Sequence, residues 1–233
     1  MSPRRPGDLP SVAGLLLLVS ACGGGQPDQE QGRPGPAASA GVVGGTATGS
    51  LRDDFSDPSS GWRRNSIEKQ AADYEDGAYV LWVDNDASSY VGAVGWLEGR
   101  EFADTRFEVK ATKRSGPPGA PVGLSCRQWS EGERRGIYFA DVAGEGDVRL
   151  GLYDEEGQEI LAKAERPGLW REGENALRLD CVGQGLTFFV NGEQVLSTNN
   201  ARFPRGRVGL RAGGTSSGLT RVAFDDAVVS VVE

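Results

Sequence analysis

The chain has 233 residues, a formal net charge of −8 and a hydrophobic content of 38%. It contains no histidine, which excludes a Ser-His-Asp triad, a Cys-His pair and any imidazole ligand for a metal. The acidic balance argues against a nucleic-acid partner, because such a partner requires a cationic surface for its phosphates.

The first 22 residues have the pattern of a bacterial lipoprotein signal. Arg4 and Arg5 form a positively charged start, and an apolar run follows over 11–21. That run is too short to cross the membrane as a helix, which takes roughly 20 residues. The next feature, Val19-Ser20-Ala21-Cys22, resembles the lipobox, in which the cysteine is acylated and becomes the first residue of the mature protein. We therefore expect a signal peptide over 1–21 and lipidation at Cys22; a secreted protein with an incidental cysteine is the alternative.

Residues 22–50 read as a linker between the lipidated cysteine and a folded domain. Residues 23–50 are rich in Gly and Pro and lack aromatic side chains, so they cannot bury enough surface to offset chain entropy. All five Trp lie beyond Leu51, and we place the domain at 51–233. The lipid anchor would hold this domain on the extracytoplasmic face of the cell membrane.

The domain is predicted to be all-β. Short runs rich in β-branched and aromatic residues alternate with Gly-, Pro- and Asp-containing turns at intervals of about ten residues. Asn191-Gly192 is a strong signal for a two-residue hairpin, since both positions accept positive φ. This spacing predicts an antiparallel two-sheet sandwich. The expected strands are 78–83, 90–95, 105–112, 122–129, 136–142, 148–153, 160–164, 176–182, 186–190, 194–197, 207–212 and 220–232.

Two cysteines remain if Cys22 is acylated, and both lie in expected strands. Cys126 and Cys181 share the parity of the apolar residues around them, so both thiols should point into the core. In an oxidising compartment this arrangement favours a Cys126–Cys181 disulfide. Two separately buried thiols are the alternative.

Several segments together resemble the concanavalin A-like jelly roll of laminin-G-like and 3-keto-disaccharide hydrolase-like domains. The resemblance covers essentially all of 51–233, and it consists mostly of strand and turn residues, so it implies a fold far more strongly than an activity. The segments that carry it are 53–62, 74–79, 123–127, 175–183, 186–192, 206–210 and 224–226.

The resemblance leaves both an enzyme and a binding module open. Family 16 glycoside hydrolases use an E-x-D-x-x-E pattern on one strand, and no expected strand carries it. Asp154-Glu155-Glu156 and Glu172-x-Glu174 lie in turns, where charged residues are solvated. Hydrolysis would therefore need a carboxylate pair assembled from separate strands.

A carbohydrate-binding module needs exposed aromatic faces and polar groups that bind hydroxyls. Packing within the core is the competing role for each aromatic candidate. Arg127 follows Cys126, so strict alternation places it on the opposite, potentially ligand-facing side of the sheet. The candidate aromatic residues are Trp82, Tyr90, Trp96, Trp129 and Tyr138.

A structural calcium ion is a further possibility, and no other cofactor is expected. Calcium prefers several carboxylate and carbonyl oxygens. Asp53, Asp54 and Asp57 near the first strand could meet Asp225 or Asp226 in the last one, and similar sandwiches use an Asp of the last strand. Turn capping is the alternative role. Asp84-Asn85-Asp86 is a weaker candidate.

The sequence thus predicts a membrane-anchored lipoprotein whose sandwich binds a glycan or another cell-surface ligand without catalysis. A glycoside-active hydrolase and a structural or protein-interaction domain are the alternatives. The expected partners are the membrane, through the lipid, and carbohydrate; nucleic acid is not expected.

Replacing Cys22 by Ala tests the anchor. Without the acylated thiol, the protein should leave the membrane fraction or remain an uncleaved precursor. Fractionation and the intact mass of the mature protein provide the readout, and unchanged membrane association with unchanged mass would refute lipidation.

Overall fold

The computed structural model describes residues 49–85, 91–214 and 218–232. Within these ranges the ordered elements are β-strands, and no helix there could span a membrane. The predicted signal peptide, Cys22 and almost all of the predicted linker lie outside the described residues. The strands are β1 (Ser50–Asp53), β2 (Asn65–Ile67), β3 (Gln70–Glu75), β4 (Ala78–Asn85), β5 (Val91–Trp96), β6 (Thr105–Ser115), β7 (Val122–Glu131), β8 (Arg134–Val142), β9 (Asp147–Asp154), β10 (Gly157–Glu165), β11 (Glu174–Val182), β12 (Gly185–Val190), β13 (Glu193–Asn199), β14 (Arg207–Gly214) and β15 (Gly218–Val231).

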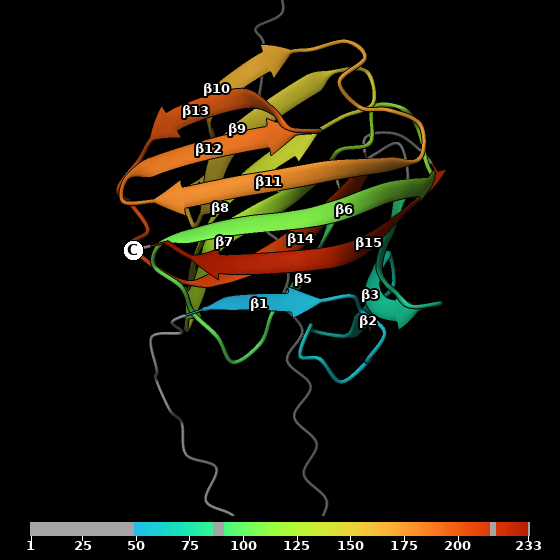
Figure 1. Ribbon diagram of the computed structural model, residues 1–233, viewed down its shortest axis with the longest axis horizontal. Helices are drawn as coiled ribbons and strands as arrows, with labels where there is room; N and C mark the ends of the chain where they lie inside the picture. Colours follow the sequence, from blue (N-terminus) through green and yellow to red (C-terminus); the bar gives the residue numbers. More distant parts are fainter. Residues whose placement is uncertain (1–48, 86–90, 215–217, 233) are drawn as a thin grey trace, which may run out of the picture. The chain divides into compact units, whose positions relative to one another are not determined.

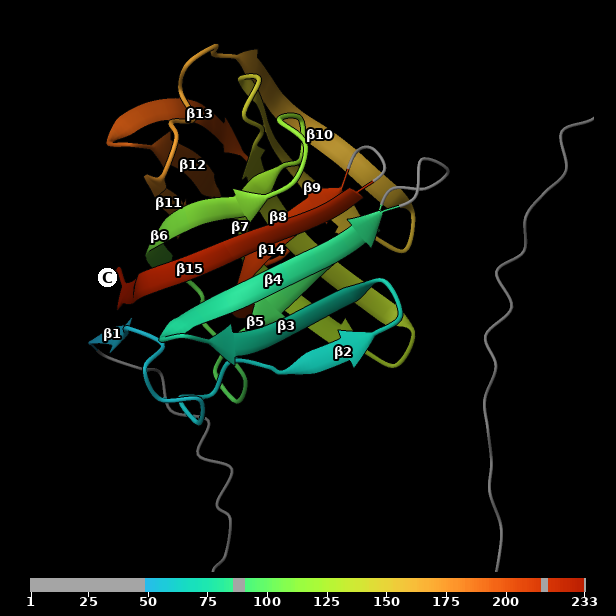
Figure 2. The ribbon, with the colours of Figure 1, turned by 90° about the vertical axis from the view of Figure 1, so that its right-hand side faces the viewer.

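The strands form two antiparallel sheets that pack face to face (Figures 1 and 2). The nine-stranded sheet has the order β13-β12-β11-β6-β15-β4-β3-β2, with β1 paired to β15. The six-stranded sheet has the order β10-β9-β8-β7-β14-β5. The predicted two-sheet sandwich is therefore confirmed, and all twelve expected strands correspond to β4–β15.

The sequence reading missed β1, β2 and β3. The six residues of β3 (QAADYE) include Ala, Asp and Glu, which have low strand propensity. The strand forms because it pairs with β4 and buries Ala71 and Ala72 against it. Tertiary pairing thus overrides local preference here.

The core fills the space between the sheets. Burial alternates along β6 and β11, so one face of each strand is apolar and enclosed. At one end Phe55, Trp62 and Tyr79 pack as an aromatic cluster, with centroids 5.5 Å apart for Phe55 and Trp62. The predicted Asn191-Gly192 hairpin joins β12 to β13, and both residues have positive φ (52° and 84°).

The Cys126–Cys181 disulfide joins the two sheets. Cys126 lies on β7 of the six-stranded sheet, and Cys181 lies on β11 of the nine-stranded sheet. Their Cα atoms are 6.7 Å apart, and both residues are fully buried. The predicted bridge is present and spans the core.

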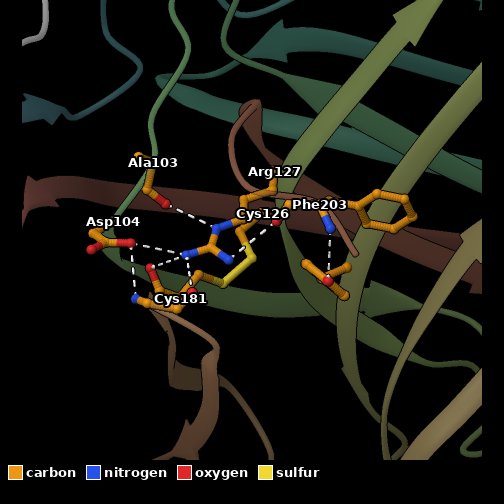
Figure 3. Close-up of polar contacts among 8 residues, drawn as sticks. Ala103, Asp104, Cys126, Arg127, Cys181 and Phe203 are labelled. Atoms are coloured by element: carbon orange, nitrogen blue, oxygen red, sulfur yellow. Dashed lines mark hydrogen bonds and ion pairs between the residues drawn. A yellow bond between two sulfur atoms is a disulfide. The ribbon is translucent and has the colours of Figure 1, made fainter. Parts of the chain in front are cut away.

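The expectation that Arg127 faces outward is wrong. A β-bulge interrupts β7 between Cys126 and Trp129, and Arg127 has a positive φ of 50°. The extra residue breaks the strict alternation on which the expectation depended. The Arg127 side chain is only 2% exposed and lies beside the disulfide (Figure 3).

The Arg127 guanidinium binds segments from both sheets. It donates to the carbonyl oxygens of Ala103 at 2.9 Å, Phe203 at 3.2 Å and Gly183 at 2.8 Å. It also forms an ion pair with Asp104 at 2.9 Å and donates to the Cys181 carbonyl at 3.4 Å (Figure 3). With its donors used inside the fold, Arg127 has a structural role and is unavailable to a ligand.

Reduction of the disulfide should destabilise the domain. The bridge closes a loop with a sequence separation of 55, and the chain-entropy model gives about 4 kcal/mol for a loop of that size. Urea unfolding with and without reductant measures the difference. The double variant C126A/C181A is the control and should not respond to reductant. Identical unfolding curves for the native protein in both conditions would contradict this prediction.

Replacing Arg127 by Met should lower the free energy of unfolding by about 3 kcal/mol or more, because Asp104 and the surrounding carbonyls lose their buried partner. Arg135→Met, at an exposed position of the adjacent strand, is the matched control and should change stability by less than about 0.5 kcal/mol. Urea midpoints report both variants. Equal midpoints would show that Arg127 does not tie the sheets together.

Candidate functional site

A groove of about 620 Å³ lies on the outer face of the six-stranded sheet. All six strands of that sheet contribute to it, and Arg63 closes one side. Its surface combines aromatic, arginine and amide side chains. The lining residues are Arg63, Val94, Trp96, Gln128, Trp129, Ser130, Arg135, Gly136, Ile137, Phe139, Tyr153, Gln158, Arg207 and Arg211.

Strand alternation places these side chains outside the core. On β8, Tyr138 and Ala140 belong to the core cluster, whereas Ile137 and Phe139 point the other way and line the groove. Gly209 of β14 lies directly opposite Trp96. A Cβ atom on Gly209 would be 2.7 Å from the Ser125 hydroxyl, so glycine is required for β14 to pass this point.

Trp96 occupies the β5 edge of the groove, and Arg63 covers it. The Arg63 backbone N–H donates to the Trp96 carbonyl at 2.9 Å, and the Tyr79 hydroxyl donates to the Arg63 carbonyl. Burial raises the pKa of Tyr79, so this hydroxyl stays protonated as a donor. The Arg63 guanidinium carbon lies 4.4 Å from the Trp96 ring centroid, and that of Arg207 lies 5.1 Å from it.

The same pairing of arginine with an aromatic ring recurs along the sheet. Arg135 lies 5.2 Å from the ring centroid of Tyr153 and donates to its hydroxyl at 3.1 Å. Arg211 lies 4.7 Å from the Phe139 centroid, and its guanidinium also binds both carboxylate oxygens of Asp141. Cation–π contact holds each guanidinium against a ring face.

Three polar atoms in this region are buried and have no hydrogen-bond partner within the part of the chain that is described. They are the Trp96 indole N–H, the Ser125 hydroxyl and the Gln128 amide oxygen. Trp96 and Gln128 line the groove, and Ser125 pairs with Gly209 beneath it. Buried polar atoms without partners are costly, so these three leave unmet hydrogen-bonding capacity at the base of the groove.

The structure brings together only part of the predicted aromatic set. Trp96 and Trp129 line the groove, and Trp129 also packs against Phe203 with centroids 6.3 Å apart. Trp82 lies on β4 of the other sheet, outside the core cluster. Tyr138 is 1% exposed, so it is a core residue and cannot stack on a ligand. Tyr90 lies outside the described residues.

The hydroxyl of Tyr138 orders the loop before β14. It donates to the Asn200 side-chain oxygen at 2.6 Å and accepts from the Phe203 backbone N–H at 2.9 Å. Burial raises the pKa of this hydroxyl. Tyr138 therefore supports the site from beneath.

The aspartates proposed for calcium do meet at one end of the sandwich. β1 pairs with β15 so that Asp53 lies opposite Ala227, beside Asp226, and a second cavity of about 720 Å³ is lined by Asp53, Asp54 and Asp226. Their carboxylates already have partners there. Asp226 pairs with Lys110 at 2.9 Å, Asp54 accepts from Ser56, and Asp53 accepts from the Trp62 indole.

Calcium binding therefore stays an untested prediction. Asp225 accepts a hydrogen bond from the backbone N–H of Asp226 at 2.7 Å. The described residues contain no group of three or more acidic or sulfur ligands placed to hold a metal ion. Asp84 is exposed on β4, and Asp86 lies outside the described residues.

Sequence reasoning missed the arginines of the groove. Arg63 lies outside every strand, Arg135 belongs to a hairpin, and Arg207 begins β14. The sequence does show that arginine outnumbers lysine. Several of these arginines lie in or beside strands of the same sheet. Only the strand order shows that they converge.

No protein-family model and no curated protein matches the sequence. Solved structures do match the fold. A carbohydrate-binding module from Bacillus subtilis (CBM66) is 16% identical, with a TM-score of 0.53, and the match covers 72% of this chain and 94% of that one. A β-glucanase from Bacillus licheniformis is 9% identical, with a TM-score of 0.58, and the match covers 80% of this chain and 100% of that one.

A third match is a protein of unknown function with a galectin-like fold from Bacillus subtilis. It is 12% identical, with a TM-score of 0.60, and the match covers 80% of this chain and 97% of that one. The domain therefore has the concanavalin A-like jelly-roll fold that the sequence resemblance implied. At these identities the similarity establishes the fold alone.

Proposed function

We propose that the protein is a membrane-anchored lipoprotein that binds a glycan in the groove of the six-stranded sheet without cleaving it. The observation that carries this proposal is Trp96, a half-buried indole on a surface where polar and aromatic side chains converge. Structural neighbours that include a carbohydrate-binding module and a glucanase support a glycan-related function.

The chemistry of the groove suits a sugar. The rings of Trp96, Trp129 and Tyr153 are each contacted by an arginine, and their remaining apolar surface can pack against the C–H face of a pyranose. Gln128 and Gln158 offer amides that can both donate to and accept from hydroxyls. An aromatic platform with a few polar groups is the usual composition of a carbohydrate site.

Among the residues that the structure describes, the groove lacks the paired carboxylates that glycoside hydrolysis needs. Both stereochemical routes normally use two carboxylic side chains, about 5–5.5 Å apart for retention and about 6.5–9.5 Å for inversion. No Asp or Glu of the described chain lines this groove. Asp141 lies nearby, but its oxygens are bound by Arg211. We therefore propose binding alone.

The proposed anchor would place this groove outside the cell membrane. As a Gly-rich coil, a linker of the predicted length would have a root-mean-square reach of roughly 30 Å. That distance separates the domain from the lipid headgroups while keeping it near the surface. Glycans of the envelope, or glycans that arrive from outside, are the accessible ligands.

Replacing Trp96 by Ala should weaken glycan binding by about tenfold, which corresponds to about 1.4 kcal/mol of stacking energy. Trp82→Ala is the matched control, because Trp82 is also half-buried but belongs to the opposite sheet. A glycan-array screen of the purified protein identifies the ligand, and calorimetry compares the variants. Binding that survives Trp96→Ala and disappears with Trp82→Ala would place the site on the nine-stranded sheet and contradict the proposal.

A further inference from the structure

Three arginines of the groove have no acidic partner among the described residues. Arg63, Arg135 and Arg207 all line it, and their side chains contact Trp96, Tyr153 and Ser130. None of the three forms an ion pair with a carboxylate of the described chain, whereas the fourth arginine, Arg211, binds Asp141. This concentration of positive charge occurs in a protein whose net charge is −8.

Arginines of a neighbouring cleft do have acidic partners, unlike those of the groove. Trp129 separates the groove from a cleft of about 370 Å³ that also contains three arginines. Each of those arginines is neutralised by an acidic side chain. The pairs are Arg134–Glu155 at 3.7 Å, Arg202–Asp154 at 2.8 Å and Arg205–Glu101 at 3.3 Å.

The ring contacts hold the groove guanidinium groups ready for a ligand. Arg63 and Arg207 both contact the Trp96 ring, so two positive charges lie beside one ring, and neither is paired with a carboxylate of the described chain. A guanidinium that lies over a ring can still offer N–H groups along its edge to a ligand. Such an edge can bind a carboxylate or a sulfate through two parallel hydrogen bonds.

We infer that the ligand of the groove is an acidic polysaccharide, with carboxylate or sulfate groups along its chain. This inference rests on the proposed function and specifies its substrate class. The acidic group of one sugar unit binds Arg63 and Arg207 beside the Trp96 ring. A second acidic group along the chain binds Arg135, at the β8 side of the groove.

The test compares polysaccharides that share a backbone and differ in charge. Polygalacturonate is measured against its methyl ester, and dextran sulfate against dextran, using calorimetry with the purified protein. We expect at least one acidic member to bind about tenfold more tightly than its neutral counterpart. Its affinity should fall as sodium chloride rises from about 0.05 M to about 0.5 M, because salt screens exposed charges.

Variants locate the charge effect in the groove. Arg207→Gln should weaken acidic binding by about tenfold, and the triple variant R63Q/R135Q/R207Q should abolish it. Arg205→Gln is the matched control, because Arg205 lies in the neighbouring cleft, outside the groove, and is paired with Glu101. It should change the affinity by less than about twofold. Melting temperatures show whether each variant is folded.

The outcomes separate this inference from the proposed function. Equal affinity for acidic and neutral partners, or binding to neutral glycans alone, overturns the inference and leaves glycan binding in place. Failure to bind any glycan of either kind overturns the proposed function itself. An equal loss of affinity in Arg205→Gln and Arg207→Gln indicates a general surface-charge effect and also overturns the inference. If the triple variant does not fold, the inference is tested by Arg207→Gln and by the comparison of acidic with neutral polysaccharides.

Discussion

The sandwich depends on one connection through its core, where Cys126 is bonded to Cys181 and the next residue, Arg127, binds carbonyl groups around it. The two sheets are separate hydrogen-bonded ladders, so their relative position depends on packing and on this connection. A buried arginine is stable there because its donors meet acceptors and its charge meets Asp104. The disulfide constrains the unfolded chain, while the guanidinium orders loops in the folded one.

The bulge that buries Arg127 also shapes the end of the groove. Beyond it, Trp129 pairs with Gly136 and packs against Phe203, while Gln128 reaches the groove. β14 follows this irregularity closely, and a Cβ atom on Gly206 would be 2.5 Å from the carbonyl carbon of Arg127. The structural connection and the candidate binding surface are thus built on the same stretch of β7, with one facing the core and the other facing solvent.

The sequence predicts features that depend on local pattern. Turn residues and alternation locate twelve strands, the Asn191-Gly192 hairpin and a disulfide whose two cysteines both point inward. Features that depend on pairing or on an inserted residue are missed. β3 has a poor strand composition and forms against β4, and the bulge at Arg127 reverses the direction that alternation assigns to it. The convergence of Arg63 and Arg207 on Trp96 depends on strand order.

The central claim is that the ligand binds over the six-stranded sheet, and the five tryptophans provide natural probes of it. Each indole N–H gives its own signal in a ¹⁵N–¹H NMR spectrum, so titration with the best-binding oligosaccharide reports on every region at once. We expect the signals of Trp96 and Trp129 to shift, while those of Trp62, Trp82 and Trp170 stay in place. A saturable shift of Trp82 or Trp170 with Trp96 unchanged would contradict the account.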